Sequence, residues 1–377
     1  MPMRSTASAT PSPRRSAEVP LPVAFVLPSF AGGGAERVVI TLANHLPADR
    51  FAATLILLQA RGPLRDLVAP HIGVIDLDRP RIRHARGALA AAICKTAPAI
   101  VLSTMAHLNI GLLSIRDRLP TGTRILVREA NDPAATLRRS GFPWLYRLLY
   151  RRYYPRADLV ISPTGRIQQA LAEMAGLSAD RLAILRNPVD AATLRAKAMP
   201  PRRHGGDGVR YVAAGRLTEQ KGFDRLLTMM VSAPADAHLT ILGDGPLDGA
   251  LRAQAKQLGL SDRVRFAGFA ENPWRDIAGA DAFLLPSRWE GLPNAALEAL
   301  ACGTPVIATP EAGGITEVAE LCPPGAVTLA PVGSAFEVAM KDVRANPVSA
   351  ARASLLPAQF HLDTIVSQLG DALVRLT

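Results

Sequence analysis

Short apolar runs alternate with longer segments of helical character along almost the whole chain, and this alternation constrains the fold most. Several runs are apolar without a regular polar alternation, as expected of strands that are covered on both faces. The intervening segments, such as residues 33–46 and 246–260, space their apolar residues as amphipathic helices do. This order predicts an α/β fold of parallel sheets covered by helices. The predicted strands are residues 23–28, 53–58, 99–103, 124–129, 158–163, 210–215, 238–243, 264–268, 282–286 and 305–309.

The alternation breaks once, in a segment of proline, glycine and charge (198–208) that is typical of a linker or surface loop. We therefore place a domain boundary just before it, near Asn187. The sequence predicts two doubly wound, Rossmann-like domains over residues 20–187 and 188–377, with ligands at the carboxyl ends of their strands. The final stretch (350–376) reads as an amphipathic helix interrupted by Pro357, and this helix could pack back on the first domain.

Residues 1–19 are rich in Ser, Pro and Arg and lack the apolar stretch of a signal peptide. We expect a short disordered tail there, although an organelle transit peptide has a similar composition. Apolar runs all fall short of the ~18 residues that a membrane-spanning helix needs. Cys94, Cys302 and Cys322 are odd in number and unclustered, which favours a reducing, cytoplasmic setting and no zinc site.

The net charge of +11 is unevenly distributed. Residues 1–190 hold 25 Lys and Arg against 13 Asp and Glu, whereas residues 191–377 hold 18 against 19. The excess predicts a polyanionic partner for the first half, and the absence of nucleic-acid-binding signatures favours an anionic membrane over nucleic acid. A basic surface that serves only solubility is the alternative.

A basic amphipathic segment, FPWLYRLLYRRYYPRADLV (142–160), is the clearest candidate for membrane contact, because such a helix can lie on an anionic leaflet. It could equally be a helix that packs its aromatic residues on its own sheet.

Two loops follow predicted strands and suit an anion. In PSFAGGGAERVV (28–39), the glycines allow close approach of a ligand to the backbone and to the helix start behind them. The loop lacks the dinucleotide-binding pattern of glycines, and a simple tight turn is the alternative. In AAGRLTEQKGFDRLL (213–227), Arg216 and Lys221 could bind a diphosphate, or could be solvated surface cations.

The segment SRWEGLPNAALEALACGTPVIAT (287–309) places Glu290 before a predicted helix and Glu298 within it. The helix should begin near Pro293 and end at Gly303. On one continuous helix, eight residues would separate the backbones by ~12 Å. This spacing does not favour a hydrolase pair, whose carboxyls stand ~5–9.5 Å apart. We expect the amides of Gly291, Leu292 and Asn294 to face a ligand at the helix start.

Together these segments resemble the retaining glycosyltransferases of family 4. The shared motifs are EGLPNAALE with its continuation EALACGTPVIAT, then GRLTEQKG, LGDGPL and PEAGGITEV, and, in the first half, GGGAERVV and VREANDP. The resemblance is dense over residues 210–320 and sparser over 23–190. It implies a GT-B fold, in which an acceptor-binding first domain faces a nucleotide-sugar-binding second domain across a central cleft.

The resemblance also implies roles for individual residues. Glu298 would hold the ribose hydroxyls and Glu290 the hydroxyls of the transferred sugar. Arg216 and Lys221 would bind the diphosphate, helped by the loop amides, and the loop ending at Gly268 would flank the nucleobase. The predicted donor-binding residues are therefore Gly33, Gly34, Arg216, Lys221, Gly268, Gly291, Leu292, Asn294 and Glu298.

Members of the family often place a histidine near the reacting sugar, and VLSTMAHLNI (101–110) offers His107, although Asn109 is as plausible and the histidine could be structural. Glu129 and Asn131 follow the next strand and are expected, with Asn109, to meet the acceptor. No metal and no cofactor are expected. The DLD at 76–78 resembles a metal-binding motif of another glycosyltransferase fold, and we treat it as chance.

The sequence thus predicts a retaining, metal-independent hexosyltransferase that uses a UDP-sugar rather than a GDP-sugar. We expect a lipid-linked sugar acceptor in lipopolysaccharide or exopolysaccharide assembly, on the cytoplasmic face of the inner membrane. The alternatives are a nucleotide-sugar epimerase of the same fold, a non-catalytic scaffold subunit and, least favoured, a nicotinamide-dependent dehydrogenase.

Overall fold

The computed structural model describes residues 19–139, 141–205, 207–346 and 351–377, and it contains two parallel sheets. The predicted tail (1–19) lies outside the described residues except for Val19. The first sheet has seven strands in the order β3-β2-β1-β4-β5-β6-β7. Its strands are β1 (Leu21–Ser29), β2 (Phe51–Gln59), β3 (Gly73–Asp76), β4 (Ile100–Thr104), β5 (Arg124–Arg128), β6 (Leu159–Ser162) and β7 (Leu182–Ile184).

The second sheet has six strands in the order β10-β9-β8-β11-β12-β13. Its strands are β8 (Arg210–Ala214), β9 (His238–Leu242), β10 (Val264–Gly268), β11 (Ala282–Leu285), β12 (Val306–Ala308) and β13 (Val327–Leu329). In both sheets the strand order reverses beside the first strand, as in a Rossmann domain. The prediction of two doubly wound α/β domains is confirmed, and all ten predicted strands are present.

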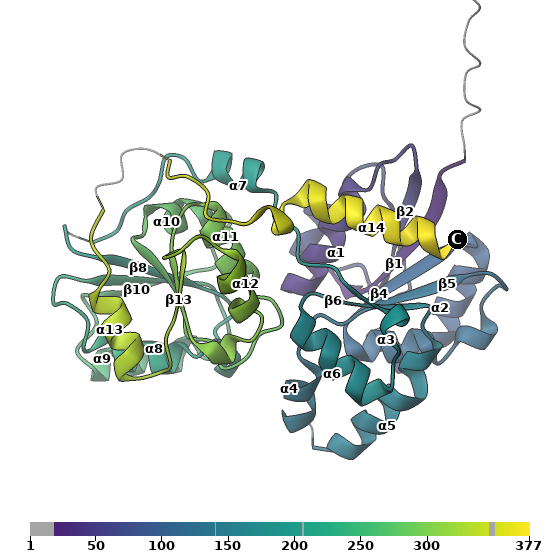
Figure 1. Ribbon diagram of the computed structural model, residues 1–377, viewed down its shortest axis with the longest axis horizontal. Coiled ribbons are helices and arrows are strands. Elements are labelled where there is room, and N and C mark those ends of the chain that lie inside the picture. Colours follow the sequence, from purple (N-terminus) through teal and green to yellow (C-terminus); the bar gives the residue numbers. More distant parts are fainter. Residues whose placement is uncertain (1–18, 140, 206, 347–350) are drawn as a thin grey trace, which may run out of the picture.

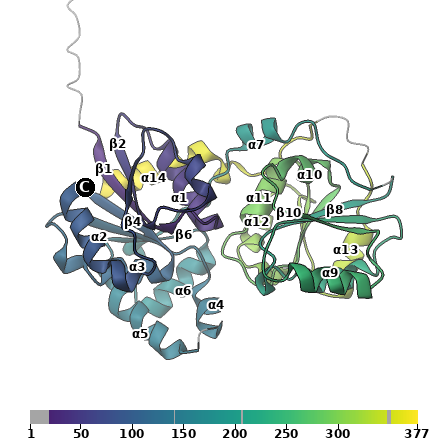
Figure 2. The same cartoon turned by 180° about the vertical axis from the view of Figure 1, so that it is seen from behind.

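Helices cover both sheets (Figures 1 and 2). Those of the first half are α1 (Gly34–His45), α2 (Ile82–Thr96), α3 (Ala106–Leu113), α4 (Pro133–Arg139), α5 (Pro143–Tyr153) and α6 (Gly165–Ala175). Those of the second half are α7 (Ala191–Lys197), α8 (Phe223–Met230), α9 (Asp248–Gln257), α10 (Trp274–Gly279), α11 (Asn294–Ala301), α12 (Ile315–Leu321), α13 (Ser334–Lys341) and α14 (Leu362–Leu376). None of the described helices is both long and apolar enough to cross a bilayer.

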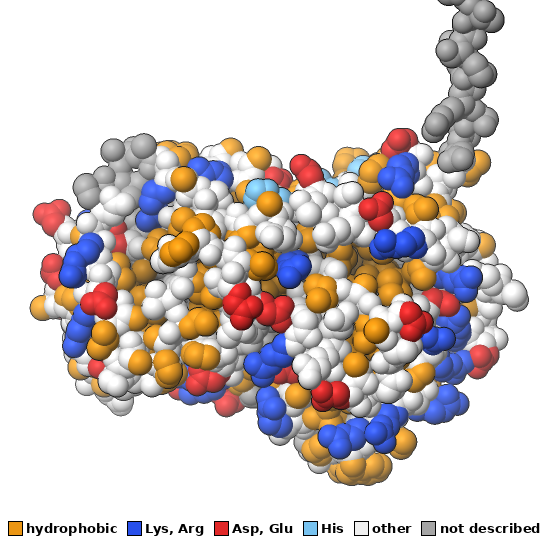
Figure 3. Space-filling view, viewed as in Figure 1, with side chains coloured by type: hydrophobic (Ala, Val, Ile, Leu, Met, Phe, Trp, Pro, Cys, Tyr) orange, Lys and Arg blue, Asp and Glu red, His pale blue; other side chains and the backbone are white. Residues whose placement is uncertain are grey.

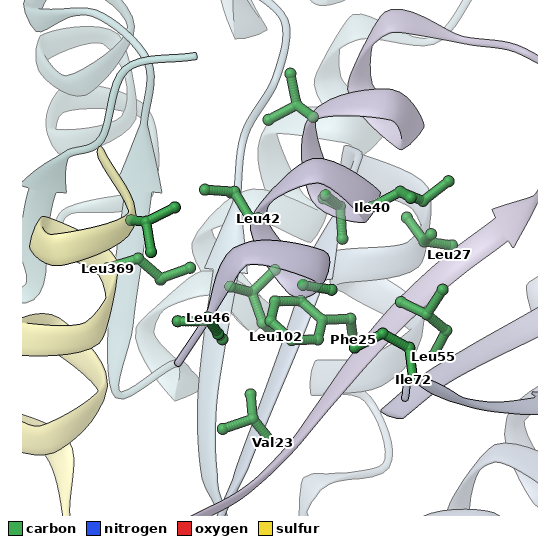
Figure 4. Packing of buried hydrophobic residues seen from close by; sticks show 14 of the residues in the cluster. Val23, Phe25, Leu27, Ile40, Leu42, Leu46, Leu55, Ile72, Leu102 and Leu369 are labelled. Atoms are coloured by element: carbon green, nitrogen blue, oxygen red, sulfur yellow. The ribbon is translucent and has the colours of Figure 1, made fainter. Parts of the chain in front are cut away.

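The first sheet is buried on both faces, which explains why its strands read as continuous apolar runs. All five residues of β4 are buried. On one face, Phe25 and Leu102 pack against Leu42 of α1 and against Leu46, which directly follows that helix (Figure 4). On the other face, the strands pack against α2, α3 and α6.

The last helix, α14, packs on the first sheet although it follows the second sheet in the chain. Its apolar face, which includes Leu369, joins the cluster around Leu42 and Leu46 (Figure 4). The chain therefore crosses between the domains twice. The two crossings lie side by side, because Val189 N donates to Phe360 O at 2.8 Å and Leu362 N donates to Val189 O at 3.1 Å.

The helix predicted over residues 350–376 is wrong in its first part. Residue 350 lies outside the described residues, and residues 351–357 form no regular structure. Pro357 ends this segment, and a helix there would break the contacts that hold it on the second domain. Arg352 donates to Ala278 O at 2.9 Å and to Ala280 O at 2.8 Å, and Leu355 N donates to Leu300 O at 2.8 Å.

Candidate functional site

The carboxyl ends of the two sheets face each other, and their loops are in van der Waals contact. Gly291, in the loop after β11, lies so close to the first domain that a Cβ there would stand 2.0 Å from Ala130 O, after β5. A Cβ on Gly314 would stand 2.8 Å from Thr164 Cγ2, after β6. Neither position has room for a side chain: Gly291 is limited by the first domain, and Gly314 by the first domain and by Gly291 O, 2.3 Å from an ideal Cβ. The predicted site therefore lies at this domain boundary (Figures 1 and 2).

Two helix N-termini from different domains converge at the boundary. Gly34 is the first residue of α1 and Asn294 the first residue of α11. The Asn294 side chain donates from Nδ2 to Gly34 O at 3.2 Å. Unpaired amides and the helix dipole make each N-terminus attractive to anions. Their convergence produces a region of positive potential between the domains.

The structure brings Glu290 and Lys221 together, although 69 residues separate them. They follow β11 and β8, which are adjacent strands. Lys221 Nζ lies 2.6 Å from Glu290 Oε1, and Ser287 Oγ donates to the same oxygen at 2.8 Å. Gln220 Nε2 donates to the other oxygen at 3.4 Å. Because the Glu290 side chain is only 8% exposed, these contacts hold a buried carboxylate in one orientation.

The loop that carries Arg216 and Lys221 is shaped by its two end glycines. Gly215 and Gly222 have φ values of +154° and +67°, which other residues rarely adopt. Gly222 also lies against Pro286 O, at 2.2 Å from an ideal Cβ. Arg216 is exposed, whereas Lys221 is partly buried. The loop thus presents one exposed cation, Arg216, and one partly buried cation, Lys221, which is paired with Glu290.

Glu298 lies one turn inside α11 and is partly buried. Its Oε2 accepts a hydrogen bond from Trp274 Nε1 of α10 at 2.8 Å. Burial raises the pKa of Glu298, and the Trp274 hydrogen bond and the charge of Arg37 on α1 oppose this rise. Residues of both domains therefore act on this carboxylate.

The glycine loop after β1 contains a buried acid beside the predicted anion site. Glu36, in the first turn of α1, is 7% exposed. A Cβ on Gly33 would lie 2.0 Å from Glu36 Oε2, so a side chain at that position would displace the Glu36 carboxylate. Within the described residues Glu36 Oε2 has no hydrogen-bond partner. Burial raises the pKa of Glu36, and the charge of Arg216 in the other domain opposes the rise.

The predicted nucleobase loop lies at the outer end of the second sheet. Gly268 ends β10 with φ +72° and has open space around its α-carbon. The next residue, Phe269, is 69% exposed. An exposed aromatic ring beside the carboxyl end of a strand can stack on a planar ligand such as a nucleobase.

The predicted acceptor residues divide into an exposed pair and a buried pair. His107, at the start of α3, and Asn131, after β5, are exposed. Partial desolvation lowers the pKa of His107. Asn109 and Glu129 are 0% and 2% exposed, so neither side chain faces solvent.

Asn109 and Glu129 belong to one buried hydrogen-bond network. Glu129 Oε2 accepts from Tyr150 Oη at 3.1 Å and from Tyr154 Oη. Asn109 Nδ2 donates to Tyr154 Oη at 3.2 Å, and its Oδ1 accepts from Ser103 Oγ at 2.7 Å. Burial raises the pKa of Glu129 to about 7 against the opposing effect of the tyrosine hydrogen bonds. The network fixes α5 to the sheet beneath the loop of Asn131.

No group of three or more His, Cys, Asp or Glu side chains in the described residues could hold a metal ion. In the DLD segment, Asp76 Oδ1 accepts from Asp78 N at 2.9 Å, and Asp78 pairs with Arg61 at 3.5 Å. β3 is the edge strand of the first sheet, on the far side of β2.

The sequence did not single out several polar residues that shape the site. Ser287 and Gln220 orient Glu290, Trp274 binds Glu298, and Asn187 binds the start of α11. Glu36 stands inside the glycine motif that drew attention to the loop, so its position could have indicated a role. The others could be found only by their contacts.

This arrangement of two facing Rossmann-like domains, with its boundary site, is that of GT-B glycosyltransferases. Residues 32–193 match the family model described as "Glycosyltransferase Family 4", and residues 196–341 match "Glycosyl transferases group 1". Together the two models cover more than four-fifths of the chain. The chain belongs to this glycosyltransferase family, and the suspected family is confirmed.

Two curated relatives carry glycosyltransferase names. The chain is 28% identical over 214 residues to an uncharacterized glycosyltransferase of Methanocaldococcus jannaschii, and covers 52% of its length. It is 28% identical over 197 residues to N-acetylgalactosamine-N,N'-diacetylbacillosaminyl-diphospho-undecaprenol 4-alpha-N-acetylgalactosaminyltransferase of Campylobacter jejuni, and covers 53% of it. These matches span 55% and 52% of this chain. The chain thus spans about half the length of these two relatives.

A longer match is the lipopolysaccharide core biosynthesis glycosyltransferase LpsE of Rhizobium meliloti, which is 28% identical over 298 residues. It covers 74% of this chain and 77% of the relative. Among solved structures, HepE of Anabaena in complex with UDP superposes with a TM-score of 0.74 at 21% identity. The superposition covers 94% of this chain and all of that one, and it shows that the fold is GT-B.

Proposed function

We propose that the protein is a retaining glycosyltransferase that moves a sugar from a nucleotide diphosphate sugar to a lipid-linked sugar acceptor. The observation that carries the proposal is the convergence of the α1 and α11 N-termini beside Arg216 and Lys221. A diphosphate carries negative charge on both phosphates. It therefore suits a site with one helix N-terminus from each domain and two cations from the second domain. Membership of the family and the lipopolysaccharide role in the name of LpsE support the same assignment.

In the proposed complex the donor lies across the boundary. Arg216 and Lys221 bind the diphosphate with the amides of Gly33 and Gly34, and Glu298 binds the ribose. Glu290 binds hydroxyls of the transferred sugar through its carboxylate, which Lys221 and Ser287 orient by their contacts with Oε1. The loop at Gly268 and the amides of Gly291, Leu292 and Asn294 complete the site. UDP is the proposed nucleotide, because HepE, a structural neighbour, was solved with UDP.

The chemistry requires stabilisation of the leaving diphosphate. Negative charge grows on the bridging phosphate oxygen as the anomeric bond breaks, and preorganised donors there lower the barrier. We propose that Arg216, Lys221 and the helix amides supply this stabilisation without a metal ion. The acceptor hydroxyl attacks from the side on which the diphosphate leaves and passes its proton to the departing phosphate. The anomeric configuration is retained.

His107 and Asn131, which are exposed, are the proposed acceptor contacts in the first domain. We propose that Asn109 and Glu129 act on the acceptor only through the buried network that positions the loop of Asn131. The acceptor class follows from the C. jejuni relative, whose name specifies a diphospho-undecaprenol substrate.

A panel of nucleotide sugars with a bacterial membrane lipid extract tests the proposed function, with products detected by mass spectrometry. The expected result is one hexose added to a lipid-linked sugar, and release of UDP that requires acceptor. A chelator should leave the rate unchanged. Interconversion of two nucleotide sugars without acceptor would show an epimerase instead.

We further propose that α5 docks the protein on the cytoplasmic face of the inner membrane. The helix exposes Trp144 and Leu148, at 67% and 56%, and the loop before it exposes Phe142, at 63%. Arg147 and Arg151 of the same helix are exposed. Figure 3 shows Lys and Arg side chains beside the hydrophobic patch at the lower tip of the first domain. Apolar side chains ringed by cations suit an anionic leaflet, at ~1 kcal/mol for each cation near the surface.

Sedimentation with vesicles tests the docking. Wild-type protein should bind vesicles of anionic lipid at low salt and be released by high salt. The double variant Arg147→Glu/Arg151→Glu should bind much less, whereas Arg375→Glu on α14, which is exposed far from the tip, should bind as the wild type does. Equal binding to neutral vesicles would contradict the docking proposal.

A further inference from the structure

The two crossings between the domains enclose a buried asparagine with an unusual set of partners. Asn187 follows β7 and lies directly before the first crossing, and it is only 5% exposed. Its neighbour Val189 pairs with the second crossing at His361. This pairing fixes the backbone close to Asn187, so the Asn187 side chain can form hydrogen bonds from a fixed position.

A directional chain of hydrogen bonds runs through Asn187. Arg128, at the end of β5, donates from Nη2 to Asn187 Oδ1. Asn187 Nδ2 donates to Leu292 O at 3.3 Å and to Asn294 Oδ1 at 2.5 Å. Asn294 Nδ2 then donates to Gly34 O at 3.2 Å. We call these four residues, Arg128, Asn187, Asn294 and Gly34, the boundary relay.

The order of donors and acceptors in the boundary relay fixes the orientation of both asparagine amide groups. A guanidinium only donates, so it fixes the oxygen of Asn187 on its side and the amide nitrogen on the other. That nitrogen fixes the oxygen of Asn294, whose own nitrogen must then face Gly34. Arg128 itself is 1% exposed and cannot turn to solvent. The chain is buried at its Arg128 end and partly exposed at Asn294, and it gains rigidity because each bond orients the next.

The boundary relay connects both halves of the proposed diphosphate site. Gly34 begins α1 in the first domain, and Asn294 begins α11 in the second. The distance between these helix N-termini decides whether both can reach one diphosphate. Among the described residues, Asn187 makes no hydrogen bond to the loop of Lys221. It meets the loop after β11 at Leu292 O and not at Glu290.

We infer that Asn187 is a positioning residue that sets the spacing of the two helix N-termini around a nucleoside diphosphate, through Asn294. The inference rests on the proposed function, because it needs a diphosphate between α1 and α11. Asn187 acts on donor binding and leaves acceptor binding alone.

A double-mutant cycle with UDP as the probe tests the inference. Calorimetric titration of UDP is carried out on full-length wild type, Asn187→Ala, Asn294→Ala and the double variant. Each single variant should weaken UDP binding about tenfold. The double variant should be no weaker than either single variant, because either substitution alone breaks the relay. Additive losses, or wild-type affinity in Asn187→Ala, would overturn the inference.

Two further variants separate positioning from loss of structure. Asn187→Asp has the same shape and keeps the bond from Arg128, but its carboxylate cannot donate to Leu292 O or Asn294 Oδ1. It should weaken UDP binding at least as much as Asn187→Ala does. Asp190→Asn alters the same crossing, where Asp190 Oδ1 accepts from Thr193 N at 3.0 Å, and should leave UDP affinity unchanged. Weakening by Asp190→Asn equal to that of Asn187→Asp would overturn the inference.

Steady-state kinetics give the second readout. For Asn187→Asp the KM for the nucleotide sugar should rise while the KM for the acceptor stays at its wild-type value. An equal rise in both would contradict a role confined to donor binding. Wild-type protein that binds no UDP would overturn the proposed function and the inference with it, whereas UDP binding unaffected by Asn187 variants overturns the inference alone.

Discussion

Substitution of Glu290 by glutamine removes the charge of a carboxylate that has three side-chain partners, and it changes the size of the side chain very little. The variant keeps an oxygen that can accept from Ser287, but the ion pair with Lys221 at 2.6 Å becomes a hydrogen bond to a neutral group. The Lys221 side chain is 19% exposed and the Glu290 side chain 8%, so the ion pair is largely shielded from solvent. A hydrogen bond to a charged group contributes ~1.5–3 kcal/mol, and we expect the free energy of unfolding to fall by this amount.

Urea unfolding followed by tryptophan fluorescence measures this loss, since Trp289 and Trp274 lie in and beside the site. Glu320→Gln is the matched control, because Glu320 is exposed on α12 and should change stability by less than ~0.5 kcal/mol. Sugar transfer by Glu290→Gln should be almost abolished while Glu320→Gln keeps wild-type activity. An unchanged free energy of unfolding together with full activity would refute the reasoning.

Three further predictions concern stability and the domain boundary. For Glu129, a pKa raised from 4.5 to about 7 means a stabilisation that is present below pH 4.5 and lost as the pH rises through 7. The free energy of unfolding of the wild type, relative to that of Glu129→Gln, should therefore fall by about 3 kcal/mol between pH 4.5 and pH 7, as measured by urea unfolding at each pH. A difference that does not change with pH would contradict a raised pKa of Glu129. Glu317 accepts from the first two amides of α6 across the boundary, so Glu317→Gln should open the domains in small-angle scattering, whereas Glu320→Gln should not. Gly291→Ala should reduce the rate of sugar transfer at least tenfold, because the added Cβ would stand 2.0 Å from Ala130 O of the first domain. Wild-type kinetics in this variant would contradict the prediction and show that the domains can move apart without loss of activity.

The strands were predictable because their burial on both faces leaves a direct mark on the sequence. Runs such as 23–28 and 99–103 contain little except apolar residues, and each forms a strand. The three-residue strands β7 and β13 were missed as strands, because a run so short has no period to detect. Residues 351–356 were wrongly predicted as helix, because they show a helical pattern that the structure does not follow. Their apolar spacing suits a helix, but tertiary contacts of Arg352 and Leu355 hold them in a conformation without regular structure.

Only part of the site could be predicted from the sequence. Glycine loops after strands indicated where a ligand could approach, and the family resemblance supplied roles for Glu290, Lys221 and Arg216. The pairing of Glu290 with Lys221 depends on β8 and β11 being neighbours, which follows from sheet order and not from local sequence. Glu129 follows a strand as a surface acid would. It is buried by Tyr150 of α5 and by Tyr154 directly after that helix, more than 20 residues later in the chain. Asn187 carried no signal except its place near the domain boundary.

Acceptor-dependent release of UDP from a UDP-sugar is the measurement that tests the central claim most directly. With wild-type protein and a lipid-linked sugar acceptor, we predict that UDP accumulates in step with the glycosylated product. We also predict that Arg216→Gln reduces both in parallel. Release of UDP at the same rate without acceptor, or unchanged release by Arg216→Gln, would contradict a glycosyltransferase whose two domains bind one donor between them.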